Sequence, residues 1–340
     1  MTRNDRMVHI VKALPSAADV HVDQLLTDFS VGAIEFSRTG LVSSIFPSVP
    51  VNNQTNKYRV WPRADFLRDE ARKRAPLTEV PRGGFRLSED NYYCDIYNFG
   101  TEIADETLAN ADNPAEIDQA LSMYVMNIMN IRSEVDFVST FMTSGIWGTS
   151  IVGVASGATP GTSVLRWDVS GSTTIEDVEA AKRAVLLGCG KPANTIAMGY
   201  DVRRVLKTNA QIVARLVNGQ TPGQVASVTD RQLSDIFDIP NVVTGSAVYN
   251  TAKEGQTASM SFVAGDFVWV GYVDPNPRNI NITAGCRFVW NGMEFGSPAG
   301  TRMERYYERR VRGWMIDGFA NWANKVTAAD AGYFFSDMVS

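Results

Sequence analysis

Histidine and cysteine are scarce in this sequence. Its 340 residues include only two histidines, His9 and His21, and three cysteines, Cys94, Cys189 and Cys286. The spacing of the histidines fits no metal-ligand motif, and three widely separated cysteines build neither a disulfide framework nor a zinc site. These absences argue against a hydrolase triad, a histidine-rich metal centre and a disulfide-stabilised secreted domain.

Long apolar runs and a positive net charge are also missing. The longest apolar runs, such as residues 151–155, are far shorter than the about 18 residues of a membrane-spanning helix, and no segment of signal-peptide type follows the N-terminus. The net charge of −5 excludes a chain that is basic as a whole and binds nucleic acid for that reason. With 44% hydrophobic and 20% charged residues, the composition is that of a folded chain of about two domains with no membrane partner.

Motifs for catalysis are absent as well. The segment Gly188-Cys-Gly-Lys191 lacks the first glycine of a phosphate-binding loop, and a proline follows its lysine. Residues 153–157 carry a serine in the fourth place, where a nucleophile elbow needs it in the third. No carboxylate spacing singles out an acid–base pair. We therefore expect a protein that is not an enzyme, with no catalytic, cofactor-binding or metal-binding residues and no cofactor.

Residues 51–102 predict a long hairpin with a charged tip. Strand-like alternation is present at residues 57–61 and 91–99, and the segment between them is rich in charge and broken by proline and glycine. A lone hairpin is at best marginally stable in water, so it needs a surface to lie on. The alternatives are a solvated loop and a hairpin that docks on another subunit.

Residues 113–144 predict one long helix, with Asn113 as its N-cap and Gly145 at its end. At 1.5 Å per residue it would be about 48 Å long, close to the about 52 Å diameter of a compact chain of this size. Such a helix belongs to a large core or to a flat, elongated molecule. One apolar face is predicted to consist of Ile117, Leu121, Tyr124, Ile128, Ile131, Val135, Val138 and Met142, and a second of Met123, Val125, Met126, Met129, Phe137 and Phe141.

The rest of the chain alternates helices and strands. Residues 145–172 predict short strands and loops. A helix is expected from Thr173 to about residue 187 with a stop at Gly188, a buried strand at 194–199, and helices capped by Asp201 and Thr229. Further strands are predicted at 241–244, 259–271 and 279–283, and residues 303–326 combine strand alternation with aromatic residues.

Two clusters of mixed charge remain, at the hairpin tip and at residues 302–312. They could be solvated faces, nucleic-acid patches or inter-subunit ion pairs, and the interleaved acids favour charge-matched contacts over nucleic acid. The resulting candidates for a subunit interface are Trp61, Arg63, Arg68, Arg72, Lys73, Arg74, Arg82, Phe85, Arg305, Arg309, Arg310 and Arg312.

The order of these elements resembles that of the major capsid protein of tailed bacteriophages. Four segments carry the resemblance: Phe237-Asp-Ile-Pro240 within residues 233–248, Pro192-Ala-Asn-Thr-Ile-Ala-Met-Gly199, Val268-Trp-Val-Gly-Tyr-Val-Asp-Pro275 and Asp330-Ala-Gly-Tyr333. Together with the element order, the resemblance covers roughly residues 45–340. It implies an α+β fold with an N-terminal arm (1–50), an extended β-hairpin loop (51–102), a peripheral domain with the spine helix (103–172), an axial domain (173–285) and a completed peripheral domain with the C-terminus (286–340).

The resemblance also implies a function. Copies of the chain are expected to form the pentamers and hexamers of an icosahedral shell around double-stranded DNA, assembled in the host cytoplasm and present in the virion. Expected partners are other copies, a separate scaffolding protein, a portal and a decoration protein, and DNA packaged without sequence-specific contacts. Since Met1 is present, we expect no cleaved N-terminal scaffolding segment. The alternatives are an encapsulin-type compartment shell, a tail or fibre component, and an enzyme with an unrecognised site.

Overall fold

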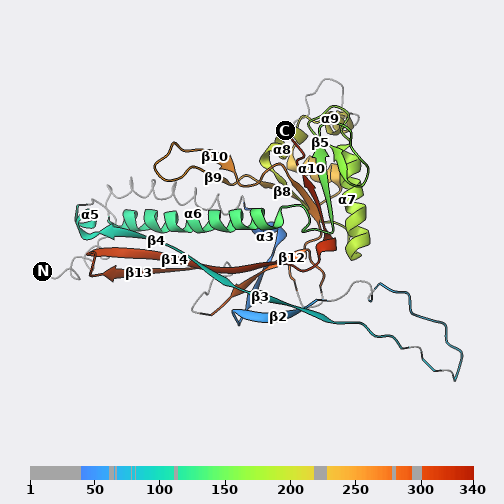
Figure 1. Ribbon diagram of the computed structural model, residues 1–340, viewed down its shortest axis with the longest axis horizontal. Coiled ribbons are helices and arrows are strands. Elements are labelled where there is room, and N and C mark those ends of the chain that lie inside the picture. Colours follow the sequence, from blue (N-terminus) through green and yellow to red (C-terminus); the bar gives the residue numbers. More distant parts are fainter. Residues whose placement is uncertain are drawn as a thin grey trace.

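The computed structural model describes residues 40–60, 65, 67–77, 79–80, 82–110, 114–217, 228–277, 281–292 and 301–340. The molecule is elongated (Figure 1). A long helix and a layer of long strands form one half, and a second sheet with several helices forms the other. A strand hairpin extends from the middle and ends in a long, irregular tip. Of the two alternatives for the long helix, a large core and an elongated molecule, the structure has the second. The arm is described only from Gly40 onward.

The long helix is α6 (Pro114–Phe141). Its predicted N-cap, Asn113, lies outside the described residues. At the other end the Trp147 indole N–H donates to the Phe141 carbonyl at 2.8 Å, which satisfies one of the carbonyls left free by the last turn. The helix thus ends three residues earlier than residue 144.

The most buried face of α6 is not the first one predicted. Val125, Met129, Ser133 and Phe137 recur every fourth residue and are buried. The first predicted face is only partly buried over most of its length, and Tyr124 is 49% exposed. Three members of the second predicted face, Val125, Met129 and Phe137, therefore hold the helix in place.

One sheet lies along α6. Its central strand is β14 (Gly313–Val326), which pairs antiparallel with β4 (Asp95–Ala104), β13 (Thr301–Glu308) and β12 (Gly285–Trp290). The strand β1 (Ser48–Val51) pairs in parallel with β12 and follows the four-residue helix α3 (Val42–Ile45). A short helix, α5 (Asp105–Ala109), continues from β4. The strand predicted at 279–283 is wrong for residues 281–283, since the strand begins at Gly285.

The predicted hairpin is confirmed, except that residues 95–99 of its expected second strand belong to β4 and pair with β14. Strands β2 (Thr55–Val60) and β3 (Ser88–Tyr93) pair antiparallel over six residues, from Thr55 opposite Tyr93 to Val60 opposite Ser88. The base of the hairpin packs on the sheet, where the Tyr92 ring stacks on Phe288 with centroids 4.4 Å apart. Past Cys94 the chain runs on into β4, so one continuous stretch links the hairpin to the long strands.

The second sheet has six strands in the order β6-β5-β15-β11-β7-β8. The strands are β5 (Thr149–Val154), β6 (Ser163–Leu165), β7 (Thr195–Gly199), β8 (Asn241–Gly245), β11 (Val268–Gly271) and β15 (Gly332–Ser336), and the 3-10 helix η1 (Ala329–Ala331) precedes β15. Strands β7 and β11 are buried at every residue. The sheet contains β5 and β6, which precede residue 172, and β15, which follows residue 286, so it crosses both expected limits of the axial domain. The division into domains stays a prediction.

Helices cover this sheet. They are α7 (Thr174–Cys189), α8 (Tyr200–Leu206), α9 (Ala210–Val217) and α10 (Asp230–Phe237), and the predicted Thr229 cap of α10 is confirmed as a capping box with Gln232. A two-stranded hairpin, β9 (Val248–Asn250) and β10 (Met260–Phe262), projects from this half.

The stop predicted for α7 at Gly188 is two residues early. The helix continues to Cys189 and ends at Gly190, whose φ of +74° is left-handed. Gly188 is instead a point of close approach, since a Cβ there would lie 2.3 Å from the Asp330 carbonyl oxygen of η1. The glycine therefore lets α7 pack directly on η1.

Candidate subunit-interface surfaces

The hairpin tip, residues 67–87, is the most exposed part of the described chain. Its cations outnumber its anions by six to three. Arg68 forms ion pairs with Asp65 and Glu70, each at 3.2 Å. Arg72, Lys73, Arg74 and Arg82 are exposed and form no ion pair with any described residue. The tip thus offers several cations whose charge is not neutralised by any residue that the structure describes.

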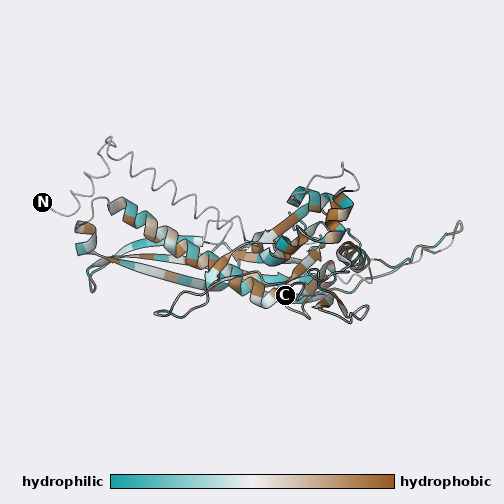
Figure 2. Cartoon of the chain, turned by 90° about the horizontal axis from the view of Figure 1, so that it is seen from above, coloured by the Kyte–Doolittle hydropathy of each residue, from teal (hydrophilic) through white to brown (hydrophobic). Residues whose placement is uncertain are grey.

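Large apolar side chains are exposed on the same tip, which the emphasis on charge had missed apart from Phe85. Leu77 is fully exposed, Leu67 is 62% exposed and Phe85 is 55% exposed. Val80 and Leu87 are also exposed. The signal was present in the sequence, since these residues recur among the charges. Figure 2 shows the tip extending clear of the body, so nothing in the described chain covers it from that side. Exposed apolar side chains grouped on one segment are typical of an interaction surface.

Trp61 and Arg63, the two candidates that precede the tip in the sequence, lie outside the described residues. Their predicted part in an interface stays a prediction.

The arginine turn, residues 308–312, joins β13 to β14. Arg309, Arg310 and Arg312 are exposed and, in the described part of the chain, take part in no ion pair. The turn is held by the Arg310 N–H, which donates to the Glu308 carboxylate at 3.0 Å, and by Arg312, whose φ is +50°. The turn therefore presents three exposed guanidinium groups at one end of the molecule (Figure 1).

Arg305 differs from these three arginines because it makes its contacts inside the subunit. Its guanidinium lies 2.8 Å from the Asp118 carboxylate of α6 and 4.3 Å from the centroid of the Trp314 ring. Desolvation raises the pKa of Asp118, and the charge of Arg305 opposes that rise. Arg305 thus pins the first turns of α6 to the sheet, and an additional part in an interface stays a prediction.

A buried polar junction lies where the arm reaches the body. The Glu134 carboxylate accepts hydrogen bonds from the N–H groups of Leu41 and Val42 at 3.0 and 3.3 Å. The partly buried Arg287 donates hydrogen bonds to Asn324 at 2.9 Å and to Ser133, and its guanidinium carbon lies 5.1 Å from the centroid of the Trp322 ring. Burial lowers the pKa of Arg287 to about 10. The junction ties the end of the arm, α6 and the long strands together.

This junction predicts a specific pH dependence. Desolvation raises the pKa of Glu134, opposed by the two backbone donors and by Arg287. A raised pKa means that the folded chain binds the proton more tightly than the unfolded chain, so the contribution of Glu134 to stability is lost as the pH rises through that pKa. Glutamine resembles the protonated carboxyl, so we expect Glu134→Gln to gain stability relative to the wild type as the pH rises above the ordinary pKa of a glutamate. Urea unfolding at a series of pH values measures this difference, with the exposed Glu254→Gln as control, and a difference independent of pH would contradict it.

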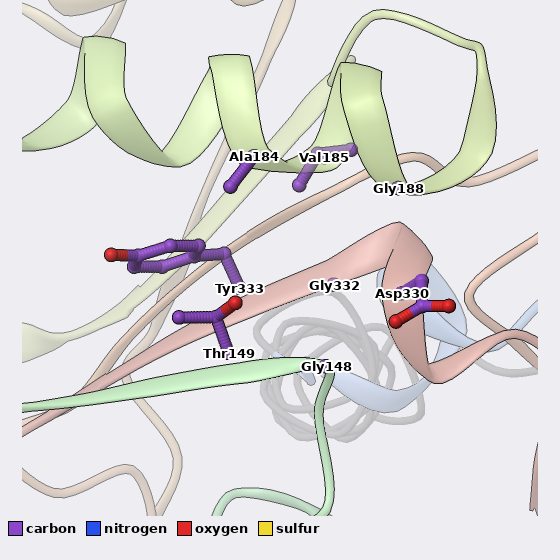
Figure 3. A pocket seen from close by; sticks show the side chains of 8 residues that line it. All are labelled: Gly148, Thr149, Ala184, Val185, Gly188, Asp330, Gly332 and Tyr333. Atoms are coloured by element: carbon purple, nitrogen blue, oxygen red, sulfur yellow. The ribbon is translucent and has the colours of Figure 1, made fainter. Parts of the chain in front are cut away.

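The remaining candidates for chemistry are modest. A cavity of about 40 Å³ lies between the end of α7 and β15 (Figure 3). Tyr333 and Thr149 lie below Ala184 on one side of the cavity, and Asp330 lies on the other side. The cavity has room for a few water molecules and is much smaller than the roughly 300 Å³ of a ligand pocket.

Two buried cysteines are poor nucleophiles. Burial raises the pKa of Cys94 to about 11 and that of Cys286 to about 12, so neither thiol is readily deprotonated.

Within the ranges that the structure describes, no three His, Cys, Asp or Glu residues are grouped to hold a metal ion. None of the helices in these ranges is long and apolar enough to cross a membrane.

Comparison with solved structures identifies the fold. A phage-related protein from Bordetella bronchiseptica matches with a TM-score of 0.65 and 21% identity over 88% of this chain and 92% of that one. The capsid of cyanophage P-SCSP1u matches with a TM-score of 0.54 and 12% identity over 87% of each chain. The chain has the fold of tailed-phage capsid proteins. The fold class expected from the element order is thereby confirmed.

An encapsulin is also similar to this chain in structure. An encapsulin complex from Synechococcus elongatus matches with a TM-score of 0.52 and 12% identity over 88% of this chain and 87% of that one. No protein-family model and no curated protein sequence matches this chain. At sequence identities of 12% and 21%, the similarity to these structures shows the fold alone.

Proposed function

We propose that this chain is a major capsid protein that assembles into the pentamers and hexamers of an icosahedral shell enclosing double-stranded DNA. The observation that carries the proposal is the hairpin tip on a chain with the tailed-phage capsid fold. The tip exposes cations and large apolar side chains on a projecting segment. A neighbouring copy supplies the surface that covers them.

The physical basis of assembly is the sum of many modest contacts. Obligate interfaces commonly bury about 2,000 Å² or more. Burial of the apolar side chains of the tip stabilises a contact by about 25 cal/mol for each Å² of apolar surface removed from water. The charged side chains of the tip select the register and the partner. The interface residues proposed here are those of the tip and the arginine turn. A scaffolding protein, a portal and a decoration protein complete the proposed assembly, which forms in the host cytoplasm and ends in the virion.

The alternative is an encapsulin-type compartment with protein cargo, favoured by the match to the encapsulin complex. The contents of the particle distinguish the two functions. Particles purified from infected or lysogenic host cells and treated with nuclease should show five- and six-fold capsomers by electron microscopy and should yield protected double-stranded DNA. Closed particles that release a folded enzyme and no DNA would establish the compartment instead.

A further inference from the structure

The dipeptide Asn291-Gly292 follows β12 directly and lies at the root of the hairpin. The Asn291 N–H donates to the Val51 carbonyl at 2.9 Å, and the Trp290 indole N–H donates to the Asn52 carbonyl at 3.1 Å. Val51 is the last residue of β1, and Asn52 lies on the short connection from β1 to β2. These two bonds join the end of β12 to the segment from which the hairpin rises, so a change in the backbone at 291–292 acts on the hairpin root.

The Asn291 side chain is free to react. It is exposed, and its carboxamide forms no hydrogen bond with any residue that the structure describes. Asn250 on the β9–β10 hairpin is equally exposed, but its carboxamide oxygen accepts hydrogen bonds from the N–H groups of Ala252 and Ser259 at 3.0 and 2.9 Å. The two asparagines thus form a matched pair, one with an unrestrained amide and one with a fixed amide.

Glycine at position 292 leaves the next backbone nitrogen accessible. The Gly292 N–H donates no hydrogen bond within the described ranges, and without a Cβ nothing shields this nitrogen from the Asn291 side chain. Packing requires the glycine, since a Cβ there would lie 2.2 Å from atoms of the Trp290 indole. Among the residues that the structure describes, Asn291 is the only asparagine followed by a glycine.

We propose that Asn291 is a site of spontaneous deamidation. The Gly292 nitrogen loses its proton to solvent base and attacks the side-chain carbonyl carbon of Asn291. A bond forms between that nitrogen and Cγ, the side-chain nitrogen leaves as ammonia, and a five-membered cyclic imide results. Water opens the imide: attack at Cγ gives aspartate, and attack at the main-chain carbonyl carbon gives isoaspartate. The net change is addition of one water and loss of one ammonia, with no oxidation or reduction.

The modification acts on the hairpin root. Both products place a carboxylate where a neutral amide stood, and isoaspartate also adds one methylene group to the main chain. The longer main chain moves Gly292 off the Trp290 ring, on which it now packs closely. Asn321 holds the backbone of Trp290 with hydrogen bonds at 2.6 and 3.0 Å, so β12 itself stays in place. The change therefore falls on the bond from the Trp290 indole to Asn52, and the hairpin becomes less firmly held.

Peptide mass spectrometry of the incubated free chain tests the site. The chain is held at neutral and at alkaline pH in heavy-oxygen water and then digested. The Asn291 peptide should exchange its amide for a carboxyl that carries heavy oxygen, at least about tenfold faster than the Asn250 peptide. The rate should rise with pH because the attacking nitrogen must be deprotonated. Asn291→Gln, whose longer side chain closes a ring much more slowly, should remain unmodified. Equal rates at the two asparagines, or an intact Asn291 at alkaline pH, would overturn the proposal.

Hydrogen exchange gives a readout of the consequence. After incubation, the amides of β2 and β3 should exchange faster in the wild type than in a fresh sample, while those of the buried strands β7 and β11 stay unchanged. Incubated Asn291→Gln should match its own fresh sample throughout. Unchanged exchange in the hairpin of a chain that mass spectrometry shows to be deamidated would overturn the effect on the hairpin root. Both measurements use the free chain and do not depend on the proposed shell function.

Discussion

Replacing Arg72, Lys73 and Arg74 by glutamate should produce a folded subunit that fails to assemble. These side chains are exposed and form no ion pair with a described residue, so their reversal breaks no ion pair in the described part of the subunit. In an assembled shell the same reversal places six units of charge change per chain in a contact selected by charge. We expect the yield of closed particles to fall at least about tenfold, with an unchanged midpoint of urea unfolding.

The control for this prediction is a reversal of equal size elsewhere. Lys191, Lys207 and Lys253 are exposed and lie in the other half of the molecule. Their replacement by glutamate changes the net charge by the same amount and should leave the particle yield within about twofold of the wild type. If this control and the tip variant assembled equally well, or equally poorly, the tip would have no special part in assembly.

Phe46→Ala should have the largest effect on the stability of the subunit itself. Phe46 is fully buried, and its ring packs against Phe137, Phe141 and Trp147 with centroids 4.9, 5.1 and 6.3 Å away. It joins the end of the arm to α6 and to the core of the six-stranded half. Loss of a buried phenylalanine leaves a cavity that costs about 3–5 kcal/mol. Urea unfolding of the unassembled chain measures the change.

Phe85→Ala provides the contrasting case with the same chemical deletion. Phe85 is 55% exposed on the hairpin tip. Its removal should change the free energy of unfolding by less than about 0.5 kcal/mol, yet it should lower the particle yield. A Phe46 variant as stable as the Phe85 variant would mean that the junction between the arm and α6 does not hold the subunit together.

The elements with strong local signals could be predicted from the sequence. The hairpin follows from the alternation at 57–61 and 91–99, and α6 follows from apolar steps of three and four residues over many turns. The choice of the buried face did not follow, because α6 carries two apolar stripes and the sequence does not show which one the sheet covers. Ser133 and Glu134 are also buried, although their polarity alone suggests exposure, because Arg287 and the backbone of the arm bind them.

Most of the features that could not be predicted depend on pairing between segments far apart in the sequence. Strand β15 lies between β5 and β11, although more than 150 residues separate it from β5 in the chain, and no local pattern specifies such a neighbour. The exposed leucines of the tip were visible in the sequence, but they were outweighed by the charges around them.

The most direct measurement is the mass of the assembled species. The chain is expressed alone and with a candidate scaffolding protein, and each product is passed through size-exclusion chromatography with light scattering and imaged by negative-stain microscopy. Closed particles of megadalton mass are the predicted result. A monomer near 37.3 kDa under both conditions would contradict a shell function for this chain.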